Sequence, residues 1–201
     1  MYTDLLICAS LLIAAMEDIK TRSVLDLVWV PAILGVAYSV VVAYPSIELL
    51  VIKVAFVGAV ALAFTYFGAI GQADAIALVF VAADLNPASP ILPLLGTAAA
   101  ASVHIGYQYF TGNARGVKTI PIKKFTEEQH WIPKAVISDG VRVEVSSDVN
   151  VAREEVASKS KDGSTVEVTY GVPTVAYLGF GYLAYVIYMA IFATSVFISL
   201  P

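Results

Sequence analysis

The sequence predicts a membrane all-α fold: a bundle of six transmembrane helices with a small, mostly β cytoplasmic insert before the last helix. Three observations predict this fold. The chain of 201 residues is 59% hydrophobic and only 14% charged, whereas a soluble domain carries roughly a quarter charged residues. The apolar residues are collected in long uncharged runs, as in membrane spans. The charged residues gather instead between residues 111 and 170.

Six apolar segments follow one another along the chain. A span needs about 20 residues at a rise of about 1.5 Å each, and the fourth segment is shorter than that. The first five segments form a predicted membrane domain over residues 1–110, and the sixth lies in residues 171–201. The segments are Tyr2–Asp18, Val24–Tyr44, Ile47–Phe67, Asp74–Leu85, Ile91–Phe110 and Val172–Leu200.

The insert, residues 111–170, has the mixed composition of a soluble domain. Its stretches Val141–Val145 and Val166–Tyr170 alternate apolar and polar residues, which is the pattern of half-buried strands. Asp139-Gly140, just before the first stretch, is a tight-turn signal. About 60 residues is close to the smallest size that folds alone. We therefore expect a small antiparallel sheet that leans on the membrane part.

The positions of the basic residues predict the orientation. Lys20 and Arg22 follow the first segment, and Arg115 and Lys118 follow the fifth. With six spans, 11 of the 12 Lys and Arg residues fall on one side of the membrane. Because cytoplasmic loops carry an excess of Lys and Arg, we expect a multi-pass protein of the cell membrane with both chain ends outside. Nucleic-acid binding is not expected, since no basic stripe is interleaved with aromatic residues.

Carboxylates in or beside the apolar segments are few, and an ionisable group at membrane depth indicates function. Asp18 closes the first segment and Asp74 opens the fourth, so both are expected near the cytoplasmic boundary although they lie 56 positions apart. Asp84 is expected to end a helix at the outer interface, and Asp4 to be a solvated end.

Two aspartates that share one site cannot both ionise, because like charges a few ångströms apart repel strongly. The anion of Asp18 and Asp74 would take a proton from a water, which attacks a peptide carbonyl. The protonated partner would hydrogen-bond the developing oxyanion and later help to protonate the leaving amine. Such a pair needs neither a metal nor another cofactor. Spacing alone leaves a generic boundary role open for both residues.

The other ionisable side chains have simpler interpretations. His104 and His130 show no metal-ligand spacing and are expected to form hydrogen bonds or face solvent. Cys8 is the only cysteine, which excludes an intramolecular disulfide and a multi-cysteine zinc site. Lys53 lies about one turn beyond Glu48 and is expected to snorkel beside that carboxylate, rather than to line an ion path.

Two short motifs surround the aspartates. In Asp18-Ile19-Lys20-Thr21-Arg22-Ser23-Val24-Leu25-Asp26, a basic residue, a short polar stretch and an aliphatic residue separate two aspartates. Gly71-Gln72-Ala73-Asp74 stands at the start of a helical segment. Together they resemble the two catalytic motifs of the type IV prepilin peptidases, which are aspartic proteases of the G-x-G-D type. The six-span plan and the Gly171-Val172-Pro173 entry to the last segment resemble the archaeal branch, the preflagellin (prearchaellin) peptidases.

The resemblance implies a membrane aspartic endopeptidase with Asp18 and Asp74 as its catalytic pair and Lys20, Asp26 and Gly71 as supporting motif residues. The implied substrates are archaellin-like or pilin-like precursors with class III signal peptides. Their short basic leader would be removed at the cytoplasmic face, while their apolar helix stays in the bilayer. Bacterial relatives that also methylate the new N-terminus carry a cysteine-rich segment. This chain has none, so the resemblance implies cleavage without methylation.

The second motif departs from the family at Ala73, where the family has glycine. Glycine permits φ > 0 and close backbone approach, which the methyl group of alanine resists. Ala73 therefore predicts either a helical backbone at this position or an altered motif geometry. We also expect the loop Gly68–Gly71 to act as a hinge that admits the substrate. Gly71→Pro should then abolish cleavage and leave the protein inserted.

Three other functional classes remain open. A presenilin-like protease also pairs an aspartate with G-x-G-D but cuts within a span, and the position of Asp18 beside Lys20 favours a cut at the edge. A proton-coupled carrier would use the same two aspartates as a relay, although the inverted repeats typical of carriers are not found. An assembly scaffold would bind a partner through the insert. Asparagine at Asp18 or Asp74 is expected to stop proteolysis without unfolding the chain.

Overall fold

The chain folds into two compact units. The first unit comprises Met1–Asp18, Val24–Ala101 and Thr174–Pro201, and the second comprises Ile19–Ser23 and Ser102–Pro173. The structure, a computed structural model, describes residues 2–42, 47–67, 70–84, 91–112, 116–128, 130–146, 149–161 and 163–198.

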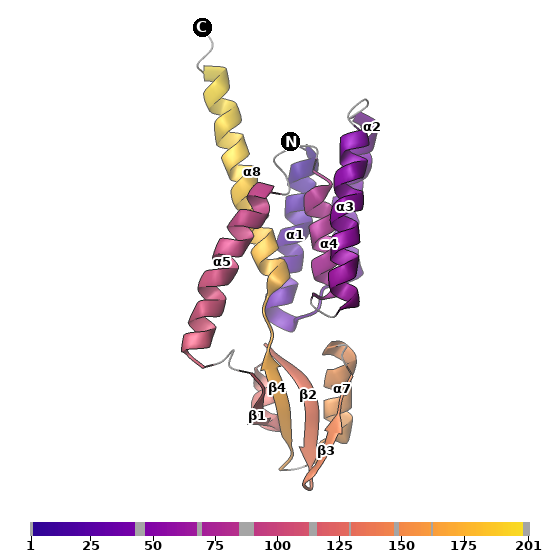
Figure 1. Cartoon of the computed structure of the whole chain (residues 1–201), viewed down its shortest axis with the longest axis vertical. Coiled ribbons are helices and arrows are strands. Elements are labelled where there is room, and N and C mark those ends of the chain that lie inside the picture. Colours follow the sequence, from indigo (N-terminus) through magenta and orange to yellow (C-terminus); the bar gives the residue numbers. More distant parts are fainter. Residues whose placement is uncertain are drawn as a thin grey trace. The chain divides into compact units, whose positions relative to one another are not determined.

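The first unit is helical (Figure 1). Two of its helices extend into the second unit: α1 with its last three residues, and α5 from Ser102 onward. The elements are α1 (Tyr2–Thr21), the 3₁₀ turn η1 (Asp26–Trp29), α2 (Val30–Val42), α3 (Ile47–Tyr66), α4 (Gln72–Ala82), α5 (Ile91–Phe110) and α8 (Thr174–Ile198).

One apolar core joins α1, η1, α2, α4 and α8 in this unit. The Trp29 ring stacks on Phe80 with 5.6 Å between ring centroids, which links η1 to α4. A glycine lets α5 and α8 approach closely: a Cβ at Gly181 of α8 would lie 2.6 Å from the carbonyl oxygen of Pro93 in α5. The fully or nearly fully buried members of the core are Ile7, Cys8, Leu11, Ala14, Val28, Trp29, Ala32, Ala77, Val81, Val175, Leu178, Tyr182 and Tyr185.

The predicted bundle of six transmembrane helices is wrong. Among the described residues, two helices are long and apolar enough to cross a membrane, α3 (Ile47–Tyr66) and the Thr174–Ile191 part of α8. The expected second span is divided into η1 and the 13-residue α2, and α4 has only 11 residues.

The other two expected spans have the length but not the composition of a span. Helix α1 carries Asp4, Glu17 and Asp18 within its 20 residues, and α5 carries polar side chains such as His104 and Gln108 along its length. Apolar character alone reveals neither the break between η1 and α2 nor the effect of these polar positions.

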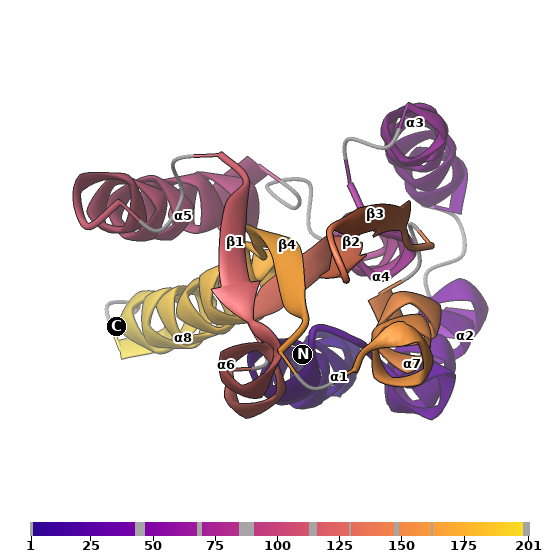
Figure 2. The ribbon, with the colours of Figure 1, turned by 90° about the horizontal axis from the view of Figure 1, so that it is seen from below.

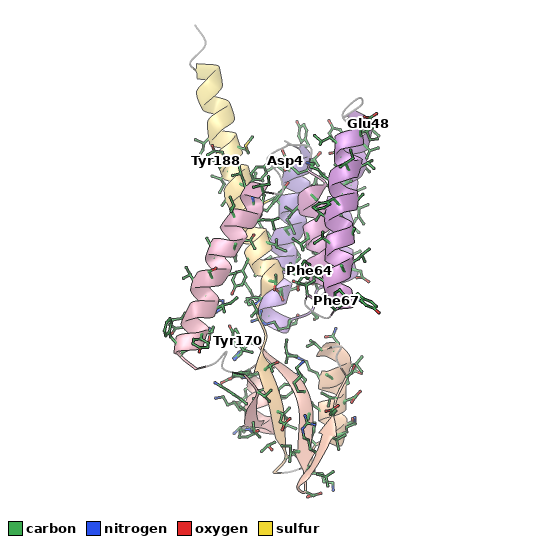
Figure 3. The ribbon with its side chains drawn as sticks, viewed as in Figure 1. Asp4, Glu48, Phe64, Phe67, Tyr170 and Tyr188 are labelled. Carbon is green, nitrogen blue, oxygen red and sulfur yellow. The ribbon has the colours of Figure 1, made fainter. Side chains whose placement is uncertain are left out.

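Helix α3 leaves most of its apolar surface uncovered. Only 11% of the residues in Ile47–Tyr66 are buried within the chain, against 44% for the candidate span of α8. In Figure 3, Glu48 and Asp4 lie at one end of this unit, and Phe64 and Phe67 lie at the other. A large exposed apolar surface marks a site of contact with a membrane or with another protein.

The second unit contains a four-stranded antiparallel sheet in the order β1-β4-β2-β3 (Figure 2). One face of the sheet is covered by two helices, since Phe125 of α6 and Val156 of α7 share a core with Val136 and Val166 of the strands. The elements are β1 (Lys118–Pro121), α6 (Ile122–Glu127), β2 (Trp131–Ser138), β3 (Val141–Glu144), α7 (Val149–Lys159) and β4 (Thr165–Tyr170).

Both strands expected from the sequence are present, as β3 and β4. The turn between β2 and β3 falls at Asp139 and Gly140, with φ of 54° and 78°, and pairs Ser138 with Val141. Two consecutive residues at φ > 0 are the requirement of a type I′ hairpin turn. The insert also contains the helices α6 and α7, so it is mixed α and β rather than mostly β.

Candidate active site

Asp18 lies near the end of α1, and its side chain is turned into the first unit. The residue is only 8% exposed, and its Oδ2 accepts a hydrogen bond from the backbone N–H of Ala176 at 3.3 Å. Ala176 is the third residue of α8, so its N–H belongs to the first turn, whose amides have no acceptor within the helix. The positive end of a helix dipole stabilises a negative charge. This contact therefore favours the anion of Asp18.

The close approach of α1 and α8 depends on Gly179. A Cβ at this position would lie 2.8 Å from the carbonyl oxygen of Leu11 and 3.1 Å from the Cβ of Ala15. Real Cβ atoms essentially never lie under 3.0 Å from a backbone oxygen. Glycine thus permits the crossing that brings the first turn of α8 against Asp18.

Asp74 occupies the first turn of α4, outside both candidate spans. Its Oδ2 accepts the backbone N–H of Gly71 at 3.0 Å, which caps the helix. Burial raises the pKa of Asp74 to about 6, from an ordinary value of 3.8. The hydrogen bond from Gly71 opposes this rise, and the negative charge of Asp18 adds to it.

The two aspartates therefore share one end of the first unit. Helix α1 ends where α4 and α8 begin (Figure 1), and the charge of Asp18 acts on the ionisation of Asp74. Their contacts differ: Asp18 accepts the N–H of Ala176 from a neighbouring helix, whereas Asp74 caps its own helix and has its pKa raised by burial. Carboxyl groups whose environments separate their ionisation in this way can serve as base and acid in one reaction.

No family model, curated protein or solved structure matches the chain. The motifs and the geometry of the site are therefore the basis on which a function can be assigned.

The G-x-G-D-like motif takes up a regular helix start. Ala73 is helical and packs against the core, so this position does not require the φ > 0 that glycine allows. Gly71 precedes the helix with φ −77° and ψ 164°, which any residue adopts. Of the expected hinge Gly68–Gly71, residues 68 and 69 lie outside the described part of the chain.

The other motif residues are more peripheral. Asp26 is exposed at the start of η1, and Lys20 is exposed and belongs to the second unit. The backbone N–H of Leu25, the residue before Asp26, donates to Oε2 of Glu17 in α1 at 2.8 Å. This bond fixes the chain just after α1 and had not been expected, because only the fold brings the two residues together.

Neither histidine belongs to this site. Nε2 of His104 lies 2.9 Å from Nε2 of Gln108 and 3.2 Å from the hydroxyl of Tyr170, all in the second unit. His130 lies 3.7 Å from Glu128. Within the described residues, no group of three or more His, Cys, Asp or Glu side chains is arranged to hold a metal.

A buried polar cluster surrounds Asp84, and the sequence did not predict it. This residue follows α4 but is only 1% exposed, rather than placed at an interface. The hydroxyl of Tyr182 donates to its Oδ2 at 2.9 Å, and Nζ of Lys53 donates to its backbone oxygen. Lys53 had been assigned to Glu48 as a partner. Tyr182 stands in an apolar run that does not distinguish it from a packing residue.

Proposed function

We propose that the chain is a membrane-bound aspartic endopeptidase that removes the short basic leader from prepilin-like or preflagellin-like precursors. The observation that carries this proposal is the electrostatic interaction of Asp18 with Asp74 at one end of the helical unit. Their motifs, which resemble those of the prepilin and preflagellin peptidases, support the same assignment. In this proposal α3 and α8 cross the bilayer, and the aspartate end faces the cytoplasm.

The reaction follows from the two environments. The Asp18 anion, held by the first turn of α8, takes a proton from a water, whose oxygen attacks the scissile carbonyl carbon. Asp74 in its protonated form, which predominates below about pH 6, donates a hydrogen bond to the developing oxyanion. The proton taken by Asp18 then passes to the leaving amine as the C–N bond breaks. Each turnover consumes one water and regenerates the starting protonation of the pair.

The substrate must present its junction in an extended form, because a helical segment hides its peptide carbonyls in its own hydrogen bonds. A precursor with a basic leader and an apolar helix has its junction at the membrane boundary. This is the depth that the proposal gives to Asp18 and Asp74. A presenilin-like protease would instead cut inside the apolar helix.

The test is co-expression with tagged precursors that carry class III signal peptides. The wild-type protein should shorten the precursor by its leader, and Asp18→Asn and Asp74→Asn should each reduce cleavage by at least about a hundredfold, which is within the range of general acid–base contributions. Glu48→Gln, at the exposed start of α3, is the matched control and should cleave normally.

Mass spectrometry of the product locates the cut. Cleavage by Asp74→Asn at the wild-type rate would contradict the dyad, and a cut within the apolar helix would favour the presenilin-like alternative.

A further inference from the structure

The carboxyl group of Asp84 is buried at the opposite end of α4 from Asp74. A buried charge is costly unless it is paired and hydrogen-bonded. Asp84 is satisfied by neighbouring helices: the Tyr182 hydroxyl of α8 donates to the carboxylate, and the Lys53 ammonium of α3 donates to the backbone oxygen and interacts with the charge. Tyr185, one turn further along α8, also interacts electrostatically with Asp84. These contacts tie the end of α4 to both neighbours.

Helix α4 packs against the core through the partly buried side chains of Ile76, Leu78 and Phe80, but its fully buried side chains resist a shift along the helix axis only weakly. It has only 11 residues, and its buried side chains are mostly small: Ala75, Ala77 and Ala82 besides Val81. Alanines interlock weakly with a neighbouring helix, because methyl groups make shallow ridges. A shift by one residue would move α4 by about 1.5 Å, which is enough to separate a carboxyl pair that must share one water. Misplacement by about 1 Å can cost a hundredfold in rate.

Helix α8 contacts both ends of this arrangement. Its first turn holds Asp18 through the N–H of Ala176, and six residues later Tyr182 holds Asp84. Tyr182 is itself completely buried, with its ring beside that of Tyr185 at 5.5 Å between centroids. The same rigid helix thus fixes one aspartate of the dyad directly and the helix of the other through its far end.

We propose that Tyr182 and Asp84 are positioning residues that set α4 along α8 and so hold Asp74 at Asp18. The expected effect on cleavage rests on the proposed function. The positioning of α4 along α8 does not. Neither residue touches the substrate. Their hydrogen bond acts about 15 Å along α4 from Asp74, since ten residues separate the two aspartates at about 1.5 Å each.

The test compares Tyr182→Phe with Tyr188→Phe. Tyr182→Phe keeps the ring and removes only the hydroxyl, whereas Tyr188 is exposed on the same helix (Figure 3) and serves as the matched control. For Tyr182→Phe we expect kcat to fall at least about tenfold with KM unchanged, and the limb of the pH profile that reports Asp74 to move to lower pH. Tyr188→Phe should change neither. Asp84→Asn keeps an acceptor for the tyrosine hydroxyl and should retain most of the activity.

A second readout does not need a substrate. NMR titration of carboxyl-labelled aspartate in detergent micelles follows Asp74 directly, and its midpoint should fall in Tyr182→Phe but not in Tyr188→Phe. Failure of the wild-type protein to cleave any precursor would reject the proposed function and leave this comparison intact. An Asp74 midpoint unchanged by Tyr182→Phe, or equally changed by both variants, would overturn the positioning role. Should Tyr182→Phe not fold, Lys53→Met loosens the same end of α4 and is expected to act in the same direction.

Discussion

At the scale of single residues, Asp74 is held in a protein environment that disfavours its charge. Its pKa of about 6 exceeds the ordinary value of 3.8, so the folded chain binds this proton more tightly than the unfolded chain. The stabilisation that comes from protonated Asp74 is complete below about pH 4 and is lost as pH rises through about 6. At neutral pH the wild-type protein therefore carries the free-energy cost of an ionised, partly buried carboxylate.

Asp74→Asn should consequently stabilise the protein at neutral pH. Asparagine removes the charge, and its side-chain oxygen still accepts the N–H of Gly71. The gain should be absent near pH 4 and grow to at most about 3 kcal/mol at pH 7, from a shift of about two pH units. Thermal unfolding in one detergent between pH 4 and 8 measures it. The control is Asp26→Asn at an exposed site. Equal effects of the two substitutions at every pH would contradict the buried environment of Asp74.

Gly71 allows its two possible roles to be separated. Its φ of −77° suits alanine and proline alike, but only proline lacks the N–H that donates to Asp74. Because that hydrogen bond lowers the pKa of Asp74, Gly71→Pro should raise the midpoint of the Asp74 titration by about one unit relative to Gly71→Ala. Carboxyl NMR measures the midpoints. An identical midpoint in both variants would show that the N–H of Gly71 does not donate to Asp74. Cleavage, which the hinge hypothesis expects proline to abolish, is assayed in parallel.

At the scale of helices, Gly179 decides how closely α8 can pack on α1. Gly179→Ala places a methyl group 2.8 Å from a backbone oxygen of Leu11 and should force the helices apart, at a cost of roughly 1–3 kcal/mol. Gly106→Ala in α5 is the matched control, because a Cβ there meets nothing within 4 Å. Alanine should stabilise that helix by up to about 1 kcal/mol. Thermal midpoints should thus move in opposite directions, and a shift in the same direction would refute the close crossing.

The elements were predictable from the sequence where a local pattern specifies them. The period-two alternation at Val141–Val145 and Val166–Tyr170 and the Asp139-Gly140 turn correspond to β3, β4 and their hairpin turn. Helix α7 (Val149–Lys159) was missed because it buries only Ala152 and Val156, too few apolar positions to reveal a helical period. The spans were overcounted because apolar composition does not report where a helix breaks.

The site shows the same division between local and tertiary information. Asp18 and Asp74 were recognisable because both stand at boundaries of apolar segments and within motifs. The Ala176 contact of Asp18 could not be predicted, because a backbone N–H leaves no trace in the identity of its residue. The burial of Asp84 beside Tyr182 was likewise hidden, since it depends on which helices become neighbours.

At the scale of the whole molecule, charge and apolar surface are divided between the two units. Of the 12 Lys and Arg residues, only Lys53 belongs to the first unit, and the other 11 belong to the second. The first unit exposes the apolar side of α3 and part of α8. Because Lys and Arg near membrane spans remain on the cytoplasmic side, the proposed function leads us to expect the first unit in the membrane and the second in the cytoplasm.

Cysteine labelling tests this orientation. Cys8 is the only cysteine, so Cys8→Ser provides the background for Glu48→Cys, at the exposed start of α3, and Asp139→Cys, in a turn whose side chain is 71% exposed. A membrane-impermeant maleimide should label Glu48→Cys in intact cells, because α3 runs from that residue towards the end that carries Asp74. It should label Asp139→Cys only after permeabilisation, because the proposed topology places the whole segment Ser102–Pro173 inside the cell. Labelling of Asp139→Cys in intact cells would place the basic unit outside and invert the proposed topology. Equal labelling of both sites before and after permeabilisation would remove the membrane position itself, since a bilayer between the two sites must make them differ.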